Sequence, residues 1–411
     1  MTTAPGTVIY DSHPVRSRLR ETRLLLIQEG EWGEAITGRL QVVSLSHSPS
    51  YEAVSYTWGD RSDERTVYVD GHALRISANL ESAFRHLRSS TAPRALWADA
   101  VCINQKDTRE RSEQVELMRD IYAHCTGVLV WLGGVQGAQP REHDHTTPCR
   151  WITGCTPIDE SWTVSSSLKM YYRLPFALRH SVKIDNVLGA YCLIGLLAGN
   201  SHINSTDIMF LDNTDAFHRI VEELHGLMAS AWWTRLWVVQ EIVLPPKATL
   251  HYGQFVASWD LFAHAARNYE RHSKTCCEGH YASLHYHDIR HIEHFSRTIT
   301  ELDELRREWQ TILGRRAWWS GARPALISLR RLLWQFRPRE VSDPRDKVFS
   351  LLTLVQDWGG RDPMRPDYNL DITAVYRLTV QKSIAQDRSL LILMGSTEKT
   401  MVGLPSWLPD W

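Results

Sequence analysis

The spacing of apolar and polar residues near the start of the chain predicts a series of short strands. Two apolar runs, residues 20–30 and 36–45, are separated by a turn rich in Gly and Glu. The segment YEAVSYTWGD, residues 51–60, alternates and then ends in a loop. Residues 65–76, RTVYVDGHALRI, predict a hairpin because an Asp-Gly pair, which favours a tight two-residue turn, lies between two alternating runs. A helix capped by Ser77 is expected to follow.

The next block predicts a strand, a helix and a second strand. Residues 95–102 are a short apolar run, and residues 127–134 are another that ends in two glycines. Between them apolar residues recur at helical spacing over 109–125, and Asp107 and Glu110 have the spacing of a capping box. A strand–helix–strand unit of this length implies parallel strands joined by a right-handed crossover. We therefore expect an α/β fold.

The middle and the end of the chain have a different pattern. Residues 135–215 show little regularity and are interpreted as a long insertion. Helical spacing then returns and stops at Pro245-Pro246, and the SDPRD segment, residues 342–346, is interpreted as a helix start with Asp343 as its cap. The predicted divisions are an N-terminal tail, 1–19, an α/β domain, 20–245, and a mainly helical C-terminal region, 246–411.

Composition excludes several classes of protein. The 411 residues carry 46 Lys and Arg against 47 Asp and Glu, a balance that does not favour nucleic acid or an anionic membrane as a partner. Seven Cys without a repeated spacing form no disulfide framework and favour a reducing compartment. The N-terminal stretch lacks the apolar core of a secretory signal, and no window approaches the length of about 18 apolar residues that a membrane span needs. We expect a cytoplasmic globular protein.

One acid lies inside a predicted buried strand. Asp99 is in the middle of the run 95–102, where a charge is costly unless it is paired or has a function. In a central parallel strand, Asp99 would lie just below the crevice at the carboxyl end, with Asn104 in the loop above it. Asp99 is then either a ribose-binding acid or a structural anchor that accepts backbone N–H groups from the loop 56–60. We favour the anchor, because buried acids are usually satisfied by hydrogen bonds.

A second acid stands in the apolar run LWVVQEIVL, residues 236–244. Trp237 and Glu241 are four residues apart, which places them on the same face of a helix. A carboxylate beside an indole can bind a sugar, since the ring stacks on it and the acid accepts bonds from two hydroxyls. The alternative is that Glu241 points to solvent or pairs with an Arg of the C-terminal region, and the residues alone leave both open.

Other chemistries have weaker support. The sequence has no phosphate-binding loop, dinucleotide fingerprint or nucleophile elbow, and the apolar surroundings of Cys102 favour packing over catalysis. The stretch 271–294 carries six His and two adjacent Cys, and His287, His291 and His294 have helical spacing. Because the Cys pair lacks the C-x-x-C spacing of a zinc knuckle, we expect a His-rich surface helix and no metal site.

Three blocks of the sequence together resemble the fungal heterokaryon incompatibility (HET) domain. They are YEAVSYTWGD, then LWADAVCINQ with the helix and strand after it, and finally WWTRLWVVQEIVL. The strings SDPRDKVFSLLTLV, RPDYNLDITAVY and LPSWLPDW are similar to the segment that usually follows in such proteins. The resemblance covers roughly residues 20–134, 215–245 and 335–411.

HET domains are regarded as distant relatives of TIR domains, so the resemblance implies a TIR-like (flavodoxin-like) parallel sheet flanked by helices. In the TIR helix a Trp precedes the key Glu by four positions, as Trp237 precedes Glu241 here. In TIR-type enzymes that Glu serves NAD hydrolysis at the nicotinamide–ribose bond, where a negative charge stabilises an oxocarbenium-like ribose. The resemblance implies Glu241 as the catalytic residue, NAD as a substrate with no bound cofactor, and these substrate-binding residues: Trp237, Ser55, Trp58, Asp60, Asp99 and Asn104.

The resemblance leaves two functions open. One is an effector of non-self recognition that triggers programmed cell death by hydrolysing NAD. The other is a self-associating signalling or adaptor module without catalysis, because TIR domains include both kinds. Both imply self-association and a partner protein that carries the non-self signal, and neither requires nucleic acid or a membrane span.

Overall fold

The computed structural model describes residues 7–60, 62–135, 182–202, 214–314, 327–356, 358, 362–394, 399, 401 and 403–411. Within these residues nine strands form one sheet, in the order β5-β4-β2-β1-β6-β3-β7-β8-β9. The strands are β1 (Glu21–Ile27), β2 (Thr37–Ser44), β3 (Glu52–Ser55), β4 (Glu64–Val69), β5 (His72–Ser77), β6 (Arg94–Trp97), β7 (Gly127–Trp131), β8 (Ala248–Tyr252) and β9 (Phe255–Ser258).

Helices surround this sheet and fill the second half of the chain. Those of the described residues are α1 (Thr7–Asp11), α2 (Ala78–Leu87), α3 (Asp99–Cys102), α4 (Thr108–His124), α6 (Val182–Ala198), α7 (Thr214–Met228), α8 (Val238–Val243), α9 (Trp259–Ser273), α10 (Glu278–Tyr281), α11 (Tyr286–Ile312), α12 (Leu329–Gln335), α13 (Asp346–Leu352) and α14 (Ile372–Asp387), with 3-10 helices η1 (Ser17–Leu19), η2 (Leu45–His47), η5 (Ala231–Thr234) and η6 (Leu391–Leu393). Among them, no helix combines the length and the apolar character that crossing a membrane requires.

The middle of the sheet is parallel, whereas both ends contain antiparallel pairs. The neighbours β6, β3, β7 and β8 all run parallel. β1 joins β6 antiparallel, and β9 turns back along β8. The predicted α/β class is confirmed, but the expectation of a parallel sheet is met only in part, because β2–β4 is the one parallel pair among the described pairs outside this centre. The reason is that β1–β2, β4–β5 and β8–β9 are joined by short connections, which allow antiparallel pairing.

The strands predicted at the start of the chain are confirmed. β1 and β2 pair antiparallel along their length. The β4–β5 hairpin turns at Asp70, with φ 50°, and Gly71, with φ 77°, and a two-residue turn needs this left-handed backbone at both central positions. The Ser77 hydroxyl accepts the Leu80 N–H at 3.3 Å and caps α2, as predicted.

The predicted strand 95–102 is wrong in its second half. β6 ends at Trp97, and the residues after Ala98 form the short helix α3. The Cys102 N–H donates to the Ala98 carbonyl at 2.8 Å, which turns the chain out of the sheet. Because α3 also packs against β1, its residues other than Asp99 are apolar, as they would be in a buried strand. Over so few residues, a buried helical turn and a buried strand have the same pattern.

The start of α4 is close to its prediction. The Asp107 carboxylate accepts the Glu110 N–H at 3.1 Å and is the N-cap. The second half of the predicted capping box is absent, because the Glu110 carboxylate turns away. It accepts two bonds from the Arg23 guanidinium, at 2.6 and 3.0 Å, and one from the Asn104 N–H at 2.7 Å.

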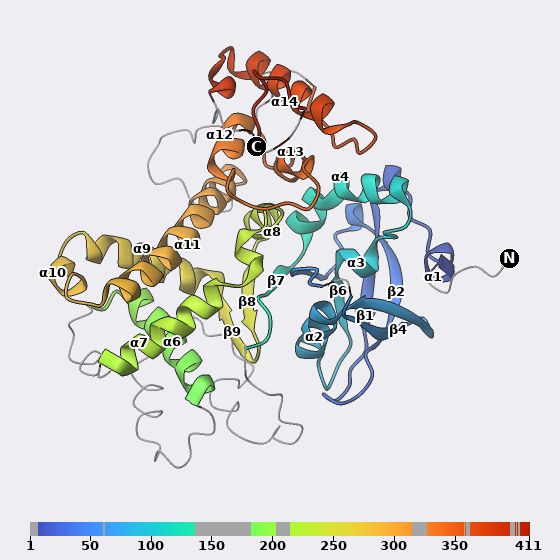
Figure 1. The fold of residues 1–411 in the computed structure, drawn as a ribbon. Helices are drawn as coiled ribbons and strands as arrows, with labels where there is room; N and C mark the ends of the chain where they lie inside the picture. Colours follow the sequence, from blue (N-terminus) through green and yellow to red (C-terminus); the bar gives the residue numbers. More distant parts are fainter. Residues whose placement is uncertain are drawn as a thin grey trace.

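Part of the predicted insertion is helical. α6 and α7 pack against each other and, respectively, against α9 and α11. In Figure 1 these four helices form one group on the opposite side of the molecule from β1 and β2. The remainder of the insertion, residues 136–181 and 203–213, lies outside the described residues.

The chain after residue 245 begins with two strands that the sequence interpretation missed. β8 lies parallel to β7, and β9 completes a hairpin that turns at Gly253, whose φ is +55°. The helical spacing before them is also interrupted, since η5 separates α7 from α8. The rest of the described C-terminal region is mainly helical, as predicted. β8 and β9 have only five and four residues, so they give a weak pattern between two strongly helical stretches.

The SDPRD segment starts a helix later than predicted. α13 begins at Asp346, and its N-cap is Arg345 rather than Asp343. The Asp343 carboxylate accepts the Arg345 N–H at 3.0 Å and pairs with its guanidinium, so it closes a turn before the helix. Arg345 also donates to the Tyr368 carbonyl at 2.7 Å, which ties this turn to the chain before α14.

Candidate functional site

Ser55 is the last residue of β3, the strand between β6 and β7 in the parallel part of the sheet. Its side chain is 1% exposed. Trp232 Nε1 donates to Ser55 Oγ at 2.7 Å, and the Ser55 hydroxyl donates to the Glu241 carboxylate. Residues from η5, β3 and α8 therefore form one buried chain of hydrogen bonds, called here the Trp232–Ser55–Glu241 network.

Local hydrogen bonds place η5 and α8 against the end of the sheet. The Ser230 hydroxyl caps η5 and also donates to the Leu132 carbonyl at 2.8 Å, directly after β7. The Leu236 N–H donates to the Glu340 carbonyl at 2.9 Å, which fixes the chain between the two helices. In Figure 1 α8 lies near the centre of the molecule, where it contacts α4, α11 and α13.

The Glu241 carboxyl has an unusual electrostatic environment. Its side chain is 5% exposed, and this burial raises the pKa of the carboxyl from 4.5 to about 7. The Arg235 charge and the Ser55 hydrogen bond oppose the rise, and the Asp99 charge adds to it. A carboxyl with this pKa exchanges its proton near neutral pH, which is the property of a general acid or base.

Asp99 connects α3 to the loop after β3. Its carboxylate accepts the Tyr56 hydroxyl at 2.7 Å and Trp58 Nε1 at 2.8 Å, and its Oδ1 also accepts the Ala100 N–H at 2.8 Å. The loop expected for a structural anchor is therefore the one that Asp99 contacts. The donors from this loop are side chains, however, and not the backbone N–H groups that were expected. A role for Asp99 in ribose binding stays a prediction.

Trp58, Asp60 and Asn104 are held by bonds of their own. The Trp58 indole N–H is directed to Asp99. Asp60 is exposed and accepts the Ser62 N–H at 2.8 Å, and Asn104 Oδ1 accepts the Lys106 N–H at 3.2 Å. These bonds join Trp58 to Asp99, and Asp60 and Asn104 to neighbours in their own loops. Their predicted part in substrate binding stays a prediction.

Trp237 directs its indole N–H toward the C-terminal region. Its Nε1 donates to Asp346 Oδ2 at 3.1 Å, and the Tyr368 hydroxyl donates to Asp346 Oδ1 at 2.6 Å. Burial raises the pKa of Asp346 to about 6, although both bonds act to lower it. Trp237 and Glu241 are joined through the helix backbone, with the Glu241 N–H 3.4 Å from the Trp237 carbonyl. Trp237 thus helps to dock α13 onto α8.

Sequence reasoning missed four neighbours of the two acids. Trp232 and Tyr56 are hydrogen-bond donors to Ser55 and Asp99, and Arg235 donates to the Tyr56 carbonyl. Tyr122 from α4 is buried nearby, and its pKa is raised first by that burial and then by the charges of Glu241 and Asp99. Trp232 and Ser55 are 177 positions apart, so no local pattern could connect them.

Comparison with known proteins shows that the segment containing Ser55, Trp232 and Glu241 matches a family model. Residues 51–241 match a family model described as Heterokaryon incompatibility protein (HET), and Glu241 is the last matched residue. The chain is also 28% identical over 420 aligned residues to heterokaryon incompatibility protein 6, OR allele, from Neurospora crassa. The alignment covers 89% of this chain and 54% of the relative, so the chain spans about half the length of the curated protein it matches. No solved structure is significantly similar to the chain.

Proposed function

We propose that this chain, whose residues 51–241 match the family model of the heterokaryon incompatibility (HET) protein, is a cytoplasmic effector of non-self recognition that triggers cell death by hydrolysing NAD. The relative from Neurospora crassa is named for heterokaryon incompatibility, which supports the biological part of the proposal. The chemical part rests on the geometry around Glu241.

The observation that carries the chemistry is the buried Glu241 carboxyl, with a pKa near 7, at the end of β3. The parallel strands lie in the order β6-β3-β7-β8, which is second, first, third and fourth along the chain. Doubly wound sheets with this order bind ligands outside the carboxyl ends of the strands, near the first and third. Ser55 ends the first of these strands and is paired with Val130 of the third.

The proposed reaction cleaves the bond between the nicotinamide nitrogen and C1′ of the ribose. The bonding electrons leave with nicotinamide, and C1′ becomes an oxocarbenium-like cation that a water molecule attacks, with the loss of one proton to solvent. The ionised Glu241 carboxylate stabilises the positive charge on the ribose and accepts bonds from its hydroxyls. The Ser55 hydroxyl orients that carboxylate by donating to it.

The burial of Glu241 means that the proposed activity needs a rearrangement that opens the site. A side chain that is 5% exposed does not reach a dinucleotide without rearrangement of the surrounding residues. We therefore assign the described conformation to the resting state, and self-association to the step that opens the site.

A non-enzymatic signalling module is the second candidate, and a specific observation favours it. The Glu241 carboxyl is buried. It accepts a hydrogen bond from the Ser55 hydroxyl, and the positive charge of Arg235 lies close by. The Trp237 indole N–H binds Asp346 and the Trp58 indole N–H binds Asp99. A buried acid with satisfied neighbours can stabilise a fold without performing chemistry.

Expression in a fungal host separates the two candidates. The chain is induced as the wild type, as Glu241→Gln and as Glu116→Gln, a matched change at a half-exposed glutamate of α4. Growth and total cellular NAD are then followed together. The proposal predicts that the wild type and Glu116→Gln deplete NAD and arrest growth, and that Glu241→Gln does neither. Growth arrest by Glu241→Gln with unchanged NAD would support the signalling module instead.

A further inference from the structure

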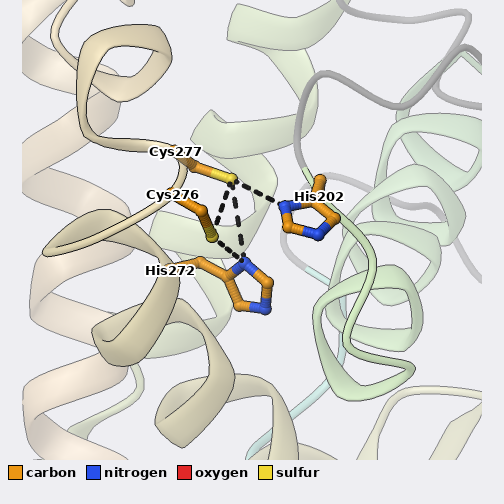
Figure 2. A group of neighbouring side chains, drawn as sticks. All are labelled: His202, His272, Cys276 and Cys277. Carbon is orange, nitrogen blue, oxygen red and sulfur yellow. Dashed lines mark hydrogen bonds between the residues drawn. The ribbon is translucent and has the colours of Figure 1, made fainter.

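Four side chains with metal-binding atoms meet where α6 ends and where α9 turns into α10. They are His202, four residues beyond the end of α6, His272 in the last turn of α9, and Cys276 and Cys277 in the turn between α9 and α10. Figure 2 shows the two imidazoles and two sulfurs pointing toward one another. One ligand atom from each residue lies within 4.8 Å of all the others.

The distances within this His202–His272–Cys276–Cys277 cluster suit a shared ion. His272 Nδ1 lies 3.0 Å from Cys276 Sγ and 3.7 Å from Cys277 Sγ. Cys277 Sγ lies 3.4 Å from His202 Nδ1 and 3.9 Å from Cys276 Sγ. In a tetrahedral zinc site, bonds of about 2.3 Å to sulfur and about 2.0 Å to nitrogen separate neighbouring ligand atoms by roughly 3.3 to 3.8 Å. The cluster needs only small shifts to reach that geometry.

A hydrogen bond outside the cluster already fixes the orientation of one imidazole. His272 Nε2 lies 2.7 Å from Asn200 Oδ1, which can only accept, so the proton of a neutral ring belongs on Nε2. Nδ1 then presents its lone pair to the two sulfurs. Metal-bound histidines are typically held in this way by an acceptor on the other ring nitrogen. The Arg271 guanidinium also donates to Asn200 Oδ1 and holds the amide in place.

We propose that the His202–His272–Cys276–Cys277 cluster binds one structural zinc ion. Two thiolates and two imidazoles are ligands that zinc prefers, and the two thiolate charges neutralise the divalent cation in a partly buried place. Four protein ligands fill a tetrahedral shell, which leaves no open position for catalysis. His272 and Cys277 are buried while His202 and Cys276 are exposed, so the ion has a route of entry.

The ion would connect segments that are distant in sequence. His202 follows α6, and the other three ligands belong to the end of α9 and the turn after it, with about 70 residues between them. Asn268 of α9 already donates to the Leu197 and Ala198 carbonyls at the end of α6, at 2.9 and 3.0 Å. Zinc would reinforce this junction and thereby the position of α10. This role is independent of the function proposed for Glu241.

The cluster differs from the helical trio His287, His291 and His294 considered from the sequence. Of these three, His291 alone belongs to a group of metal-binding side chains among the described residues, with Glu222 and His225. That group has three ligands, all of them partly or fully exposed, and no thiolate. It provides a control position for the experiment.

The test measures zinc by mass spectrometry in the full chain, purified without a histidine tag under reducing conditions. The wild type is compared with His202→Ala, Cys276→Ser and the control His291→Ala. Because His202 and Cys276 are exposed, their replacement leaves no buried cavity. We expect about one zinc per chain in the wild type and the control, and a loss of most of it in both cluster variants. Cobalt in place of zinc should give thiolate-to-metal charge-transfer absorption that Cys276→Ser weakens.

Thermal unfolding provides a second readout. Removal of zinc with a chelator should lower the Tm of the wild type and of His291→Ala, and leave the Tm of His202→Ala unchanged. Three results would overturn the proposal: a wild type that neither carries nor takes up zinc, zinc retained by both cluster variants, or a mass that shows Cys276 and Cys277 joined as a disulfide.

Discussion

At the scale of single residues, the Glu241 carboxyl is held between opposing influences. Burial favours its neutral form, whereas the Ser55 hydroxyl and the Arg235 charge favour the ionised form. The effect of burial is the largest, so the pKa of the carboxyl is raised. The proton on this carboxyl is therefore bound more tightly in the folded chain than in the unfolded one. That difference links the stability of the protein to pH.

We predict that Glu241→Gln removes a pH-dependent loss of stability. Below pH 4.5 the carboxyl is neutral in both states, and between 4.5 and about 7 the unfolded chain ionises first, so stability falls as pH rises. A shift of this size corresponds to about 3 kcal/mol once the pH exceeds the folded pKa. Gln cannot ionise. Urea unfolding at about pH 5 and about pH 8 should show Glu241→Gln gaining most of that amount relative to the wild type at the higher pH. An equal difference at both pH values would contradict the prediction.

Sequence reasoning identified Asp99 and Glu241 because each is an acid within an apolar run. It named the loop 56–60 as the anchor for Asp99 but not the Tyr56 and Trp58 side chains as donors, and it did not pair Ser55 with Glu241, because these partners come from other elements. Tyr56 and Trp58 lie more than 40 positions from Asp99, and Ser55 lies 186 from Glu241. A costly buried charge is visible in a local pattern, whereas the groups that compensate it depend on the tertiary fold.

At the scale of elements, the first turn of α4 is anchored by a buried ion pair. The Arg23 side chain on β1 is 1% exposed and donates two bonds to Glu110. The same guanidinium donates to the Cys102 carbonyl at 3.2 Å, and its Nε donates to the His13 carbonyl at 2.7 Å. One side chain thus joins β1, α3, α4 and the N-terminal segment.

We predict that Arg23→Ala destabilises the fold by about 3 to 5 kcal/mol, because it leaves the Glu110 charge and two carbonyls without their partner in a largely buried place. Arg75→Ala is the control, since Arg75 pairs with Glu64 on the exposed β4–β5 hairpin. Its loss should cost less than about 1 kcal/mol. Chemical denaturation of both variants measures the two costs. Similar values for the two changes would show that the Arg23 pair is no structural anchor.

Elements with strong local signals were predictable, and short buried ones were not. The Asp70-Gly71 turn and the Ser77 and Asp107 caps follow from the requirements of the backbone at those positions. The α3 turn and the β8–β9 hairpin are short and buried. Their pattern is set by burial, which a helix and a strand share.

At the scale of the whole molecule, the C-terminal region completes the domain that precedes it. Arg306 of α11 donates to the Ile242 and Pro245 carbonyls at the end of α8, and Arg339 donates to the Trp233 carbonyl. β8 supplies the second neighbour of β7. The family match ends at Glu241, yet α8 packs against helices that follow it.

We predict that a chain ending at residue 245 does not fold. It lacks β8, the parallel partner of β7, and it exposes the face of α8 that contacts α11 and α13. Circular dichroism during heating should show no cooperative transition for this fragment, in contrast to the full chain. A soluble fragment with cooperative unfolding would mean that the first 245 residues form an independent domain.

The most direct test of the central claim is nicotinamide release from NAD by purified protein fused to a clustering domain. The account predicts release by the clustered wild type and by Glu116→Gln. It predicts a fall of at least about 100-fold in Glu241→Gln, because the charge that stabilises the oxocarbenium-like ribose is removed. Equal release by Glu241→Gln, or none by the clustered wild type, would contradict the assignment of Glu241 as the catalytic residue.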